Sequence, residues 1–253
     1  MAVLKTRVIP TLLYRDYGLV KGERFDGKRH IGHPRQAIKI YEMRGVDELV
    51  LLNIAATAHR TGPDFELVDD LADDCFMPFS VGGGVRDADD VGRLLAVGAD
   101  KVVINTALVE APATVEESVA RYGSQCVVAS IDTKSTEVSV DEAWVRSGTQ
   151  PTGLDAATLA CRAADLGAGE ILLTSVDRDG TMTGYDLATI TSVAESVNIP
   201  VIASGGAGSY QDLVKALEAG ATAVAAAAMF HFTEQTPQEA KRHLHDSGFP
   251  VRL

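Results

Sequence analysis

The sequence has few of the residues that hold metals or disulfide frameworks. Among 253 residues there are three cysteines, Cys75, Cys126 and Cys161, and their wide spacing matches no metal-ligand motif. The six histidines are scattered in the same way and offer no ligand set. We therefore expect buried, unpaired thiols in a reducing compartment, and we expect no metal and no organic cofactor.

Excess positive charge is also missing. The chain has 23 Lys and Arg against 35 Asp and Glu, a formal charge of −12. This balance argues against a nucleic acid as the main partner, because nucleic acids select a basic surface. No apolar run is long enough to cross a bilayer, and the first residues show no apolar signal-peptide core. We expect a cytoplasmic protein without a membrane partner, in which local backbone donors can still bind small anions.

What the sequence does contain is a regular alternation of short apolar runs and longer segments with helical periodicity. Such alternation predicts parallel strands joined by helices, and eight units in about 250 residues is the size of a (β/α)8 TIM barrel. A doubly wound open sheet is the alternative. The predicted strands are Arg7–Leu12, Glu48–Asn53, Phe79–Val81, Lys101–Ile104, Cys126–Ile131, Glu170–Thr174, Pro200–Ala203 and Ala223–Ala227; the clearest helices are Asp87–Val97, Val115–Tyr122, Ala156–Leu166, Leu187–Val197 and Tyr210–Ala219.

An internal repeat favours the barrel. The run 45–50 returns as 167–172, with an offset of 170 − 48 = 122, and the glycine cluster 82–84 returns at 205–208, with an offset of 205 − 82 = 123. The ends of the first and fifth strands correspond at 132 − 13 = 119. Two similar half-barrels that close on each other avoid open sheet edges. We therefore expect residues 1–253 to form a single barrel domain.

The two glycine clusters predict two phosphate sites. In a barrel of this kind the active face is formed by the residues that follow the strands. Glycines there let backbone N–H groups converge on phosphate oxygens, although a plain turn would also need glycine. The first cradle is Gly83 and Gly84 with Asn105 and Thr106, and the second is Ser204, Gly205 and Gly206 with Ala228. They would suit a ligand with a phosphate at each end.

Charged residues on the same face are candidates for acid/base chemistry or ligand binding. Asp132 ends the fifth strand, and Asp179 and Gly180 follow the sixth. A carboxylate in such a place can transfer a proton or hold a hydroxyl, and it can also merely cap a helix. Lys21, in the long first loop, can contact a phosphate or remain a solvated surface lysine.

Together these residues resemble the HisF family, the cyclase subunit of imidazole glycerol phosphate synthase. The resemblance covers essentially the whole chain and rests on the runs 20–22, 47–49, 81–84, 100–106, 168–175, 177–181 and 203–208. It implies a lyase of histidine biosynthesis in which a HisH-like glutaminase docks on the bottom of the barrel. Ammonia then passes through the barrel to a bis-phosphorylated ribulose substrate. It also adds Thr174 to the candidate substrate-binding residues.

One catalytic residue of the family is missing. The family uses two aspartates, of which Asp132 is present, but Leu13 stands where the first is expected. Leucine cannot transfer a proton, and losing one positioned acid/base group commonly removes about 10²–10⁴-fold in rate. Asp16 lies three residues further along the chain, and catalytic geometry is too exacting for it to replace the missing aspartate. Asn53 and Ala228 also stand where the family has an aspartate and a serine.

At the opposite end of the barrel, the sequence keeps the residues that the resemblance to the HisF family leads us to expect. The family gates its ammonia entrance with a ring of one arginine, one lysine and two glutamates, which match Arg7, Lys101, Glu48 and Glu170. Charges at the starts of barrel strands are costly to bury unless they pair, so a stabilising salt-bridge layer without a transport role is the other interpretation.

Three hypotheses follow. The chain also resembles the WbuZ-type HisF-like branch of surface-polysaccharide clusters, which lacks the same aspartate and is thought to work with a HisH-like glutaminase and a separate sugar amidotransferase. The first hypothesis is such an amidotransferase subunit, with altered or absent cyclase chemistry. The second is an imidazole glycerol phosphate synthase that tolerates Leu13. The third is a non-enzymatic binding or scaffolding barrel. Whether the chain is itself an enzyme stays open at this point.

Overall fold

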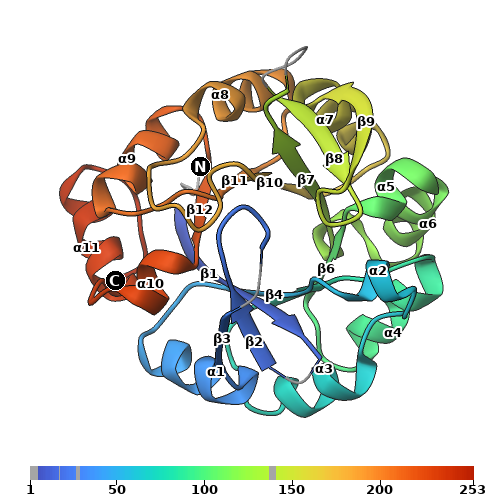
Figure 1. Cartoon of the computed structure of the whole chain (residues 1–253), viewed down its shortest axis with the longest axis horizontal. Coiled ribbons are helices and arrows are strands. Elements are labelled where there is room, and N and C mark those ends of the chain that lie inside the picture. Colours follow the sequence, from blue (N-terminus) through green and yellow to red (C-terminus); the bar gives the residue numbers. More distant parts are fainter. Residues whose placement is uncertain (1–4, 17, 27–28, 137–140) are drawn as a thin grey trace.

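A closed eight-stranded parallel barrel forms the body of the molecule (Figure 1). The computed structural model describes residues 5–16, 18–26, 29–136 and 141–253. Each barrel strand pairs with the next, and the last pairs in parallel with the first through Arg7 and Ala223. The (β/α)8 prediction is therefore confirmed, and the open-sheet alternative is wrong. The strands are β1 (Arg7–Arg15), β4 (Leu49–Asn53), β5 (Phe79–Gly82), β6 (Lys101–Ile104), β7 (Val127–Lys134), β10 (Glu170–Ser175), β11 (Val201–Ser204) and β12 (Ala223–Ala226).

Helices surround the barrel on all sides (Figure 1). Several begin at a side chain that accepts a backbone N–H of the first turn, such as Asp87, Asp155 and Asp186, and Ser209 forms a reciprocal capping box with Asp212. The helices are α1 (Pro34–Met43), α2 (Ala56–His59), α3 (Phe65–Ala72), α4 (Ala88–Ala96), α5 (Thr106–Glu110), α6 (Ala113–Tyr122), α7 (Ala156–Asp165), α8 (Leu187–Ser196), α9 (Tyr210–Glu218), α10 (Ala228–Phe232) and α11 (Pro237–Asp246), with a 3₁₀ turn at Ser124–Cys126. No helix of the described residues is both long and apolar enough to cross a membrane.

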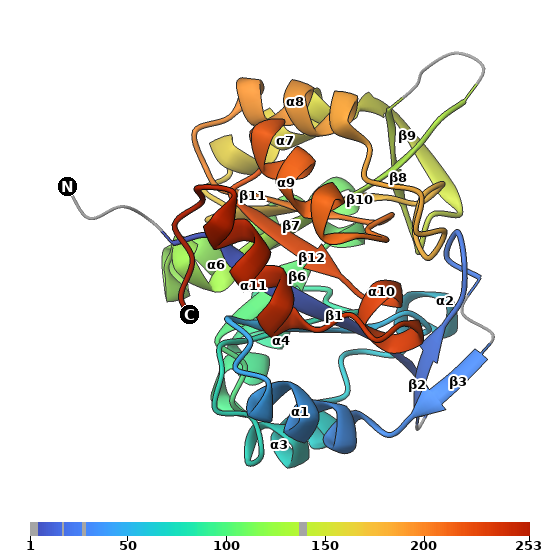
Figure 2. The same cartoon turned by 90° about the vertical axis from the view of Figure 1, so that its left-hand side faces the viewer.

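Two antiparallel hairpins extend the barrel at equivalent places, after its first and fifth strands. The first is β2 (Gly18–Lys21) with β3 (Arg29–Gly32), and the second is β8 (Glu142–Val145) with β9 (Gln150–Asp155). Figure 2 shows both projecting from the same end of the barrel. The sequence analysis did not predict them, and it ended the first strand at Leu12. The strand continues to Arg15 because Leu13, Tyr14 and Arg15 pair with β2.

The apolar core has two parts, as a filled barrel requires. The larger cluster packs the outer surface of the strands against the helices. A smaller cluster fills the barrel, and its members come from seven of the eight strands: Ile9, Val50, Val103, Val128, Leu172, Ile202, Ala223 and Ala225, with the partly buried Leu52 packed against them. The barrel is thus closed by side chains below the face where the loops converge.

Candidate functional site

A cavity of about 270 Å³ lies at the C-terminal ends of the barrel strands. It is where the sequence analysis placed the active face, and it contains Asp132 and Leu13. Every residue predicted to bind ligand also lines it. Those residues are Lys21, Gly83, Gly84, Asn105, Thr106, Thr174, Asp179, Gly180, Ser204, Gly205, Gly206 and Ala228. The structure therefore brings the predicted groups from both halves of the chain to one cavity.

Asp132 is the one predicted catalytic carboxylate in this cavity. It lies on β7 and is 8% exposed. Burial, assisted by the negative charge of Asp179 and opposed by Lys134, raises the pKa of Asp132 to about 7. A carboxyl group with a pKa in this range can either accept or donate a proton near neutral pH. The geometry thus provides one group suited to acid/base chemistry.

Leu13 lies on the opposite side of the barrel mouth. In the strand order β1–β4–β5–β6–β7, the strand that carries Leu13 is four places from the strand that carries Asp132, which is half the circumference of an eight-stranded barrel. Asp16 does not replace it, since this residue is exposed in a turn after β1 and does not line the cavity. The cavity therefore has Asp132 on one side and an apolar side chain on the other.

Asn53 serves the local structure. Its Oδ1 accepts the backbone N–H groups of Ala55 and Ala56, at 3.0 Å and 3.1 Å. These contacts fix the start of α2, so the amide side chain is already engaged by the backbone. Leu13 on β1 and Asn53 on β4 both differ from the residues expected by resemblance. Of these two differences, Leu13 is the one that changes the chemistry.

Lys21 and Asp179 form an ion pair that joins the end of β2 to the loop after β10. Lys21 Nζ lies 2.8 Å and 3.0 Å from the two carboxylate oxygens of Asp179, and Lys21 is 2% exposed. The backbone N–H of Arg24 also donates to the carbonyl of Asp179 at 2.8 Å. Gly180 has a φ of 76°, and a Cβ there would collide with the carbonyl oxygen of Gly22. This contact needs glycine, and through it the first loop covers one side of the cavity.

The sequence analysis missed the residues that cover the cavity from the hairpin side. Ser147, in the turn between β8 and β9, lines the cavity and donates from Oγ to the carbonyl of Ile54 at 3.2 Å. Phe25, from the first loop, also lines it and lies next to Gly148. The glycine at position 148 is compatible with a turn, but nothing in the sequence indicates that this turn folds over the barrel mouth.

Thr11 is a further unpredicted residue of the cavity. Its Oγ1 is buried and has no hydrogen-bond partner among the described residues, and Thr11 and, across the barrel on β7, Ser130 both line the cavity. The offset of 119 that relates Leu13 to Asp132 also relates these two residues, since 130 − 11 = 119. The two halves of the barrel thus contribute equivalent hydroxyl side chains to the cavity. Thr11 has an unused hydrogen-bonding group for a small polar ligand.

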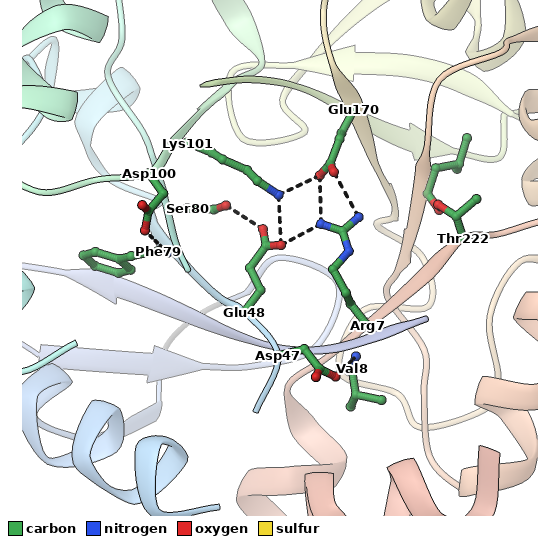
Figure 3. Close-up of polar contacts among 11 residues, drawn as sticks. Arg7, Val8, Asp47, Glu48, Phe79, Ser80, Asp100, Lys101, Glu170 and Thr222 are labelled. Carbon is green, nitrogen blue, oxygen red and sulfur yellow. Dashed lines mark hydrogen bonds and ion pairs between the residues drawn. The ribbon is translucent and has the colours of Figure 1, made fainter. Parts of the chain in front are cut away.

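The four residues of the expected ring form a closed cycle of ion pairs at the other end of the barrel (Figure 3). Arg7 lies 2.6 Å from Glu48 and 3.0 Å from Glu170, and Lys101 lies 2.9 Å and 3.1 Å from the same two residues. Ser80 Oγ donates to the remaining oxygen of Glu48 at 2.7 Å. Burial alone would lower the pKa of Arg7, but Glu170 and Glu48 outweigh it and the pKa is raised. Each cation touches both carboxylates, so the ring is locally neutral.

Metal ions in proteins are held mainly by His, Cys, Asp and Glu side chains. Among the described residues, no three His, Cys, Asp or Glu side chains are placed to hold a metal ion. The three cysteines are free, as expected, but they are half-buried, where the sequence analysis expected full burial. The reason is their position outside the barrel. Cys75 lies between α3 and β5, Cys126 ends the 3₁₀ turn, and Cys161 lies on α7.

Comparison with known families agrees with this geometry. The family model for histidine biosynthesis proteins matches residues 7–236, which spans all eight barrel strands and both ends of the barrel described above. The match does not separate the cyclase from the sugar-amidating branch. The chain belongs to the histidine biosynthesis protein family, the barrel family of HisF and HisA.

Proposed function

We propose that this chain is the HisF-like barrel subunit of a two-component glutamine amidotransferase. In this proposal a HisH-like glutaminase docks at the ring end and releases ammonia, which crosses the barrel to the cavity, where a phosphorylated ligand binds. A separate sugar amidotransferase would use that ammonia to amidate a surface-polysaccharide sugar. The observation that carries the proposal is an asymmetry: the charged ring is complete, whereas Leu13 occupies the place of a catalytic aspartate.

The inside of the barrel supports a route between the two ends. The ring lies at the N-terminal ends of the strands, and members of the interior apolar cluster, such as Ile9 and Leu172, follow two residues further along the same strands. Two members of that cluster, Val103 and Ala225, also line the cavity, so the cluster reaches the cavity floor. A small uncharged molecule can cross apolar side chains at far lower cost than an ion. On arrival it would meet the hydroxyl groups of Thr11 and Ser130.

Apolar side chains at the ring end support a docked partner. Met43 ends α1 and Phe76 lies in the segment before β5, and these side chains are 80% and 81% exposed. Both segments lead into the N-terminal ends of barrel strands, where the ring lies. Large exposed apolar side chains are enriched at protein interfaces.

The loss of the cyclase reaction rests on Leu13. Asp132 keeps a pKa of about 7, but a single acid/base group cannot replace a positioned pair. The second candidate function, imidazole glycerol phosphate synthase, is favoured by the retained Asp132 and by the complete set of cavity residues. The two functions differ in one measurable property, the turnover of the bis-phosphorylated ribulose intermediate.

That turnover is the first experiment. Ammonium salt replaces the glutaminase, and the wild type is compared with Leu13→Asp and with Asp132→Asn as a negative control. We expect an inactive wild type and a gain in Leu13→Asp of about 10²-fold or more over background. A wild type that turns over as fast as a cyclase with both aspartates would contradict the proposal and establish the histidine-pathway function.

The docking step is tested separately, by the glutaminase activity of a HisH-like partner encoded in the same genome. We expect the chain to stimulate that activity, and we expect Phe76→Asp to abolish the stimulation. Met182→Asp is the matched control, because Met182 is also an exposed apolar side chain but lies in the loop after β10, at the cavity end. Absence of stimulation by the wild type would instead support the scaffolding hypothesis.

A further inference from the structure

One wall of the cavity carries an apolar patch. Leu13 on β1 and Leu52 on β4 are partners in the parallel register, so their side chains lie next to each other on the same face. Both are half-buried and both line the cavity. Phe25, between β2 and β3, lines it as well, as do Ile54 and Val85 from the loops after β4 and β5. Thr11, Arg15, Asn53 and Thr57 line the cavity on this side too, so Leu13 and Leu52 form an apolar patch within a mixed wall.

The opposite wall is polar. Asp132, Thr174 and Ser204 come from β7, β10 and β11, and the Lys21–Asp179 pair joins the end of β2 to the loop after β10. These groups can hydrogen-bond the hydroxyl and phosphate oxygens of a ligand. The apolar patch and these polar groups therefore lie on different sides of the barrel mouth.

This division restricts the ligand. A hydroxyl group placed against Leu13 and Leu52 would lose its hydrogen bonds to water without replacing them, which disfavours it. A methyl group in the same place is removed from water and is favoured. An aspartate at position 13 would reverse both preferences, so the leucine changes which ligands the cavity accepts as well as removing an acid/base group.

We propose that the cavity selects a phosphorylated ligand that carries a short apolar substituent, such as the methyl of an N-acyl group or a deoxy carbon, seated on Leu13 and Leu52. The polar part of the ligand lies toward Asp132 and the glycine cluster after β11. This inference rests on the proposed function to the extent that the cavity must hold a phosphorylated molecule. It adds the substituent that distinguishes the ligand.

The sole tryptophan of the chain provides the readout. Trp144 on β8 is the register partner of Asp132, so its fluorescence reports on the edge of the cavity. Two matched pairs of probes are titrated: N-acetylglucosamine 1-phosphate against N-formylglucosamine 1-phosphate, and 6-deoxyglucose 1-phosphate against glucose 1-phosphate. The first pair differs by one methyl group, and the second by one hydroxyl.

In at least one pair, the member with the methyl group is expected to bind about tenfold more tightly. Leu13→Asn is expected to remove that preference and Leu13→Ala to weaken it, so a folding defect in one variant does not decide the result. Leu187→Asn, an exposed leucine on α8 outside the cavity, is the matched control and keeps the preference.

Equal affinities within both pairs for the wild type would overturn the inference, as would a preference that survives in Leu13→Asn. Pyrophosphate separates this failure from a failure of the proposed function. If pyrophosphate changes the fluorescence but neither pair discriminates, the inference alone is wrong. If neither pyrophosphate nor any sugar phosphate binds, the phosphorylated ligand of the proposed function is wrong as well.

Discussion

Removal of one cation from the charged ring tests whether the ring is an integrated unit. In Lys101→Met the ring changes from neutral to a net charge of −1. Lys101 Nζ lies 2.9 Å from Glu48 and 3.1 Å from Glu170, and the side chain of Glu48 is only 2% exposed. After the substitution Glu48 keeps Arg7 and Ser80 as its partners.

The expected cost follows from this burial. Loss of one partner from a buried ion pair destabilises a protein by about 3–5 kcal/mol. The low end applies here, because Lys101 and Arg7 keep 16% and 22% of their side-chain surface exposed and Arg7 still contacts both carboxylates. We therefore expect a loss of about 3 kcal/mol in the free energy of unfolding. For a chain of this length, that loss corresponds to a decrease in Tm of about 6–12 °C.

The assay is urea denaturation of a double-mutant cycle. Glu48→Gln alone leaves the ring at +1, whereas Glu48→Gln with Lys101→Met restores neutrality. The double variant should therefore be more stable than the sum of the single losses by about 1 kcal/mol or more. Arg121→Met is the control, since Arg121 and Asp89 form an exposed pair and the denaturation midpoint should not move.

Additive single losses, each below about 1 kcal/mol, would refute the reasoning. The four residues would then be independent, well-solvated surface charges, and the ring could not be the unit on which the proposed function depends.

Three further predictions concern other parts of the barrel. Burial raises the pKa of Asp132 to about 7, so the ionised carboxyl destabilises the fold. The stability of the wild type relative to Asp132→Asn should therefore fall by up to about 4 kcal/mol as the pH rises from 4 through 7. Urea denaturation at pH 5 and pH 8 measures this fall, and a pH-independent difference would contradict it. Gly180→Ala should separate the first loop from its contact at Gly22 and cost about 1 kcal/mol or more, with faster cleavage of that loop in limited proteolysis; unchanged cleavage would show that the contact does not hold the loop. Lys241→Met should cost about 3 kcal/mol in thermal unfolding, because it leaves Asp47, 3.1 Å away and 5% exposed at its side chain, without its buried cation; restored stability in a double variant with Asp47→Asn is the expected control.

The barrel and most of its cavity could be predicted from the sequence for a physical reason. Parallel strands buried on both faces read as short apolar runs, and the residues that follow them must meet at one end of a barrel. That rule alone brought Lys21, Asp132 and Gly205 together from distant parts of the chain, and the structure places all three in the cavity.

The cover of the cavity could not be predicted in the same way. Its residues, such as Phe25 and Ser147, lie in turns whose position depends on tertiary contacts, including the hydrogen bond from Ser147 to Ile54. The hairpin strands β8 and β9 are short and β9 is largely exposed, so they lack the apolar alternation by which strands are recognised. The contact at Gly180 is also tertiary, and the sequence showed only a glycine in a turn.

The two hairpins that project from the mouth have a consequence for the association of copies of this chain. A closed barrel has no free strand edge, but among the described strands β3 pairs only with β2 and β9 only with β8, so each hairpin presents an edge on which another chain could add a strand. Both edges carry features that discourage such addition. On β9, Pro151 removes a hydrogen-bond donor and Gly153 has a φ of 73°, which interrupts the extended backbone. Strand β3 has only four residues and begins with the exposed side chains of Arg29 and His30, so it is a short edge that carries a charge. The two hairpins can therefore extend from the barrel mouth while offering little template for β-sheet aggregation there.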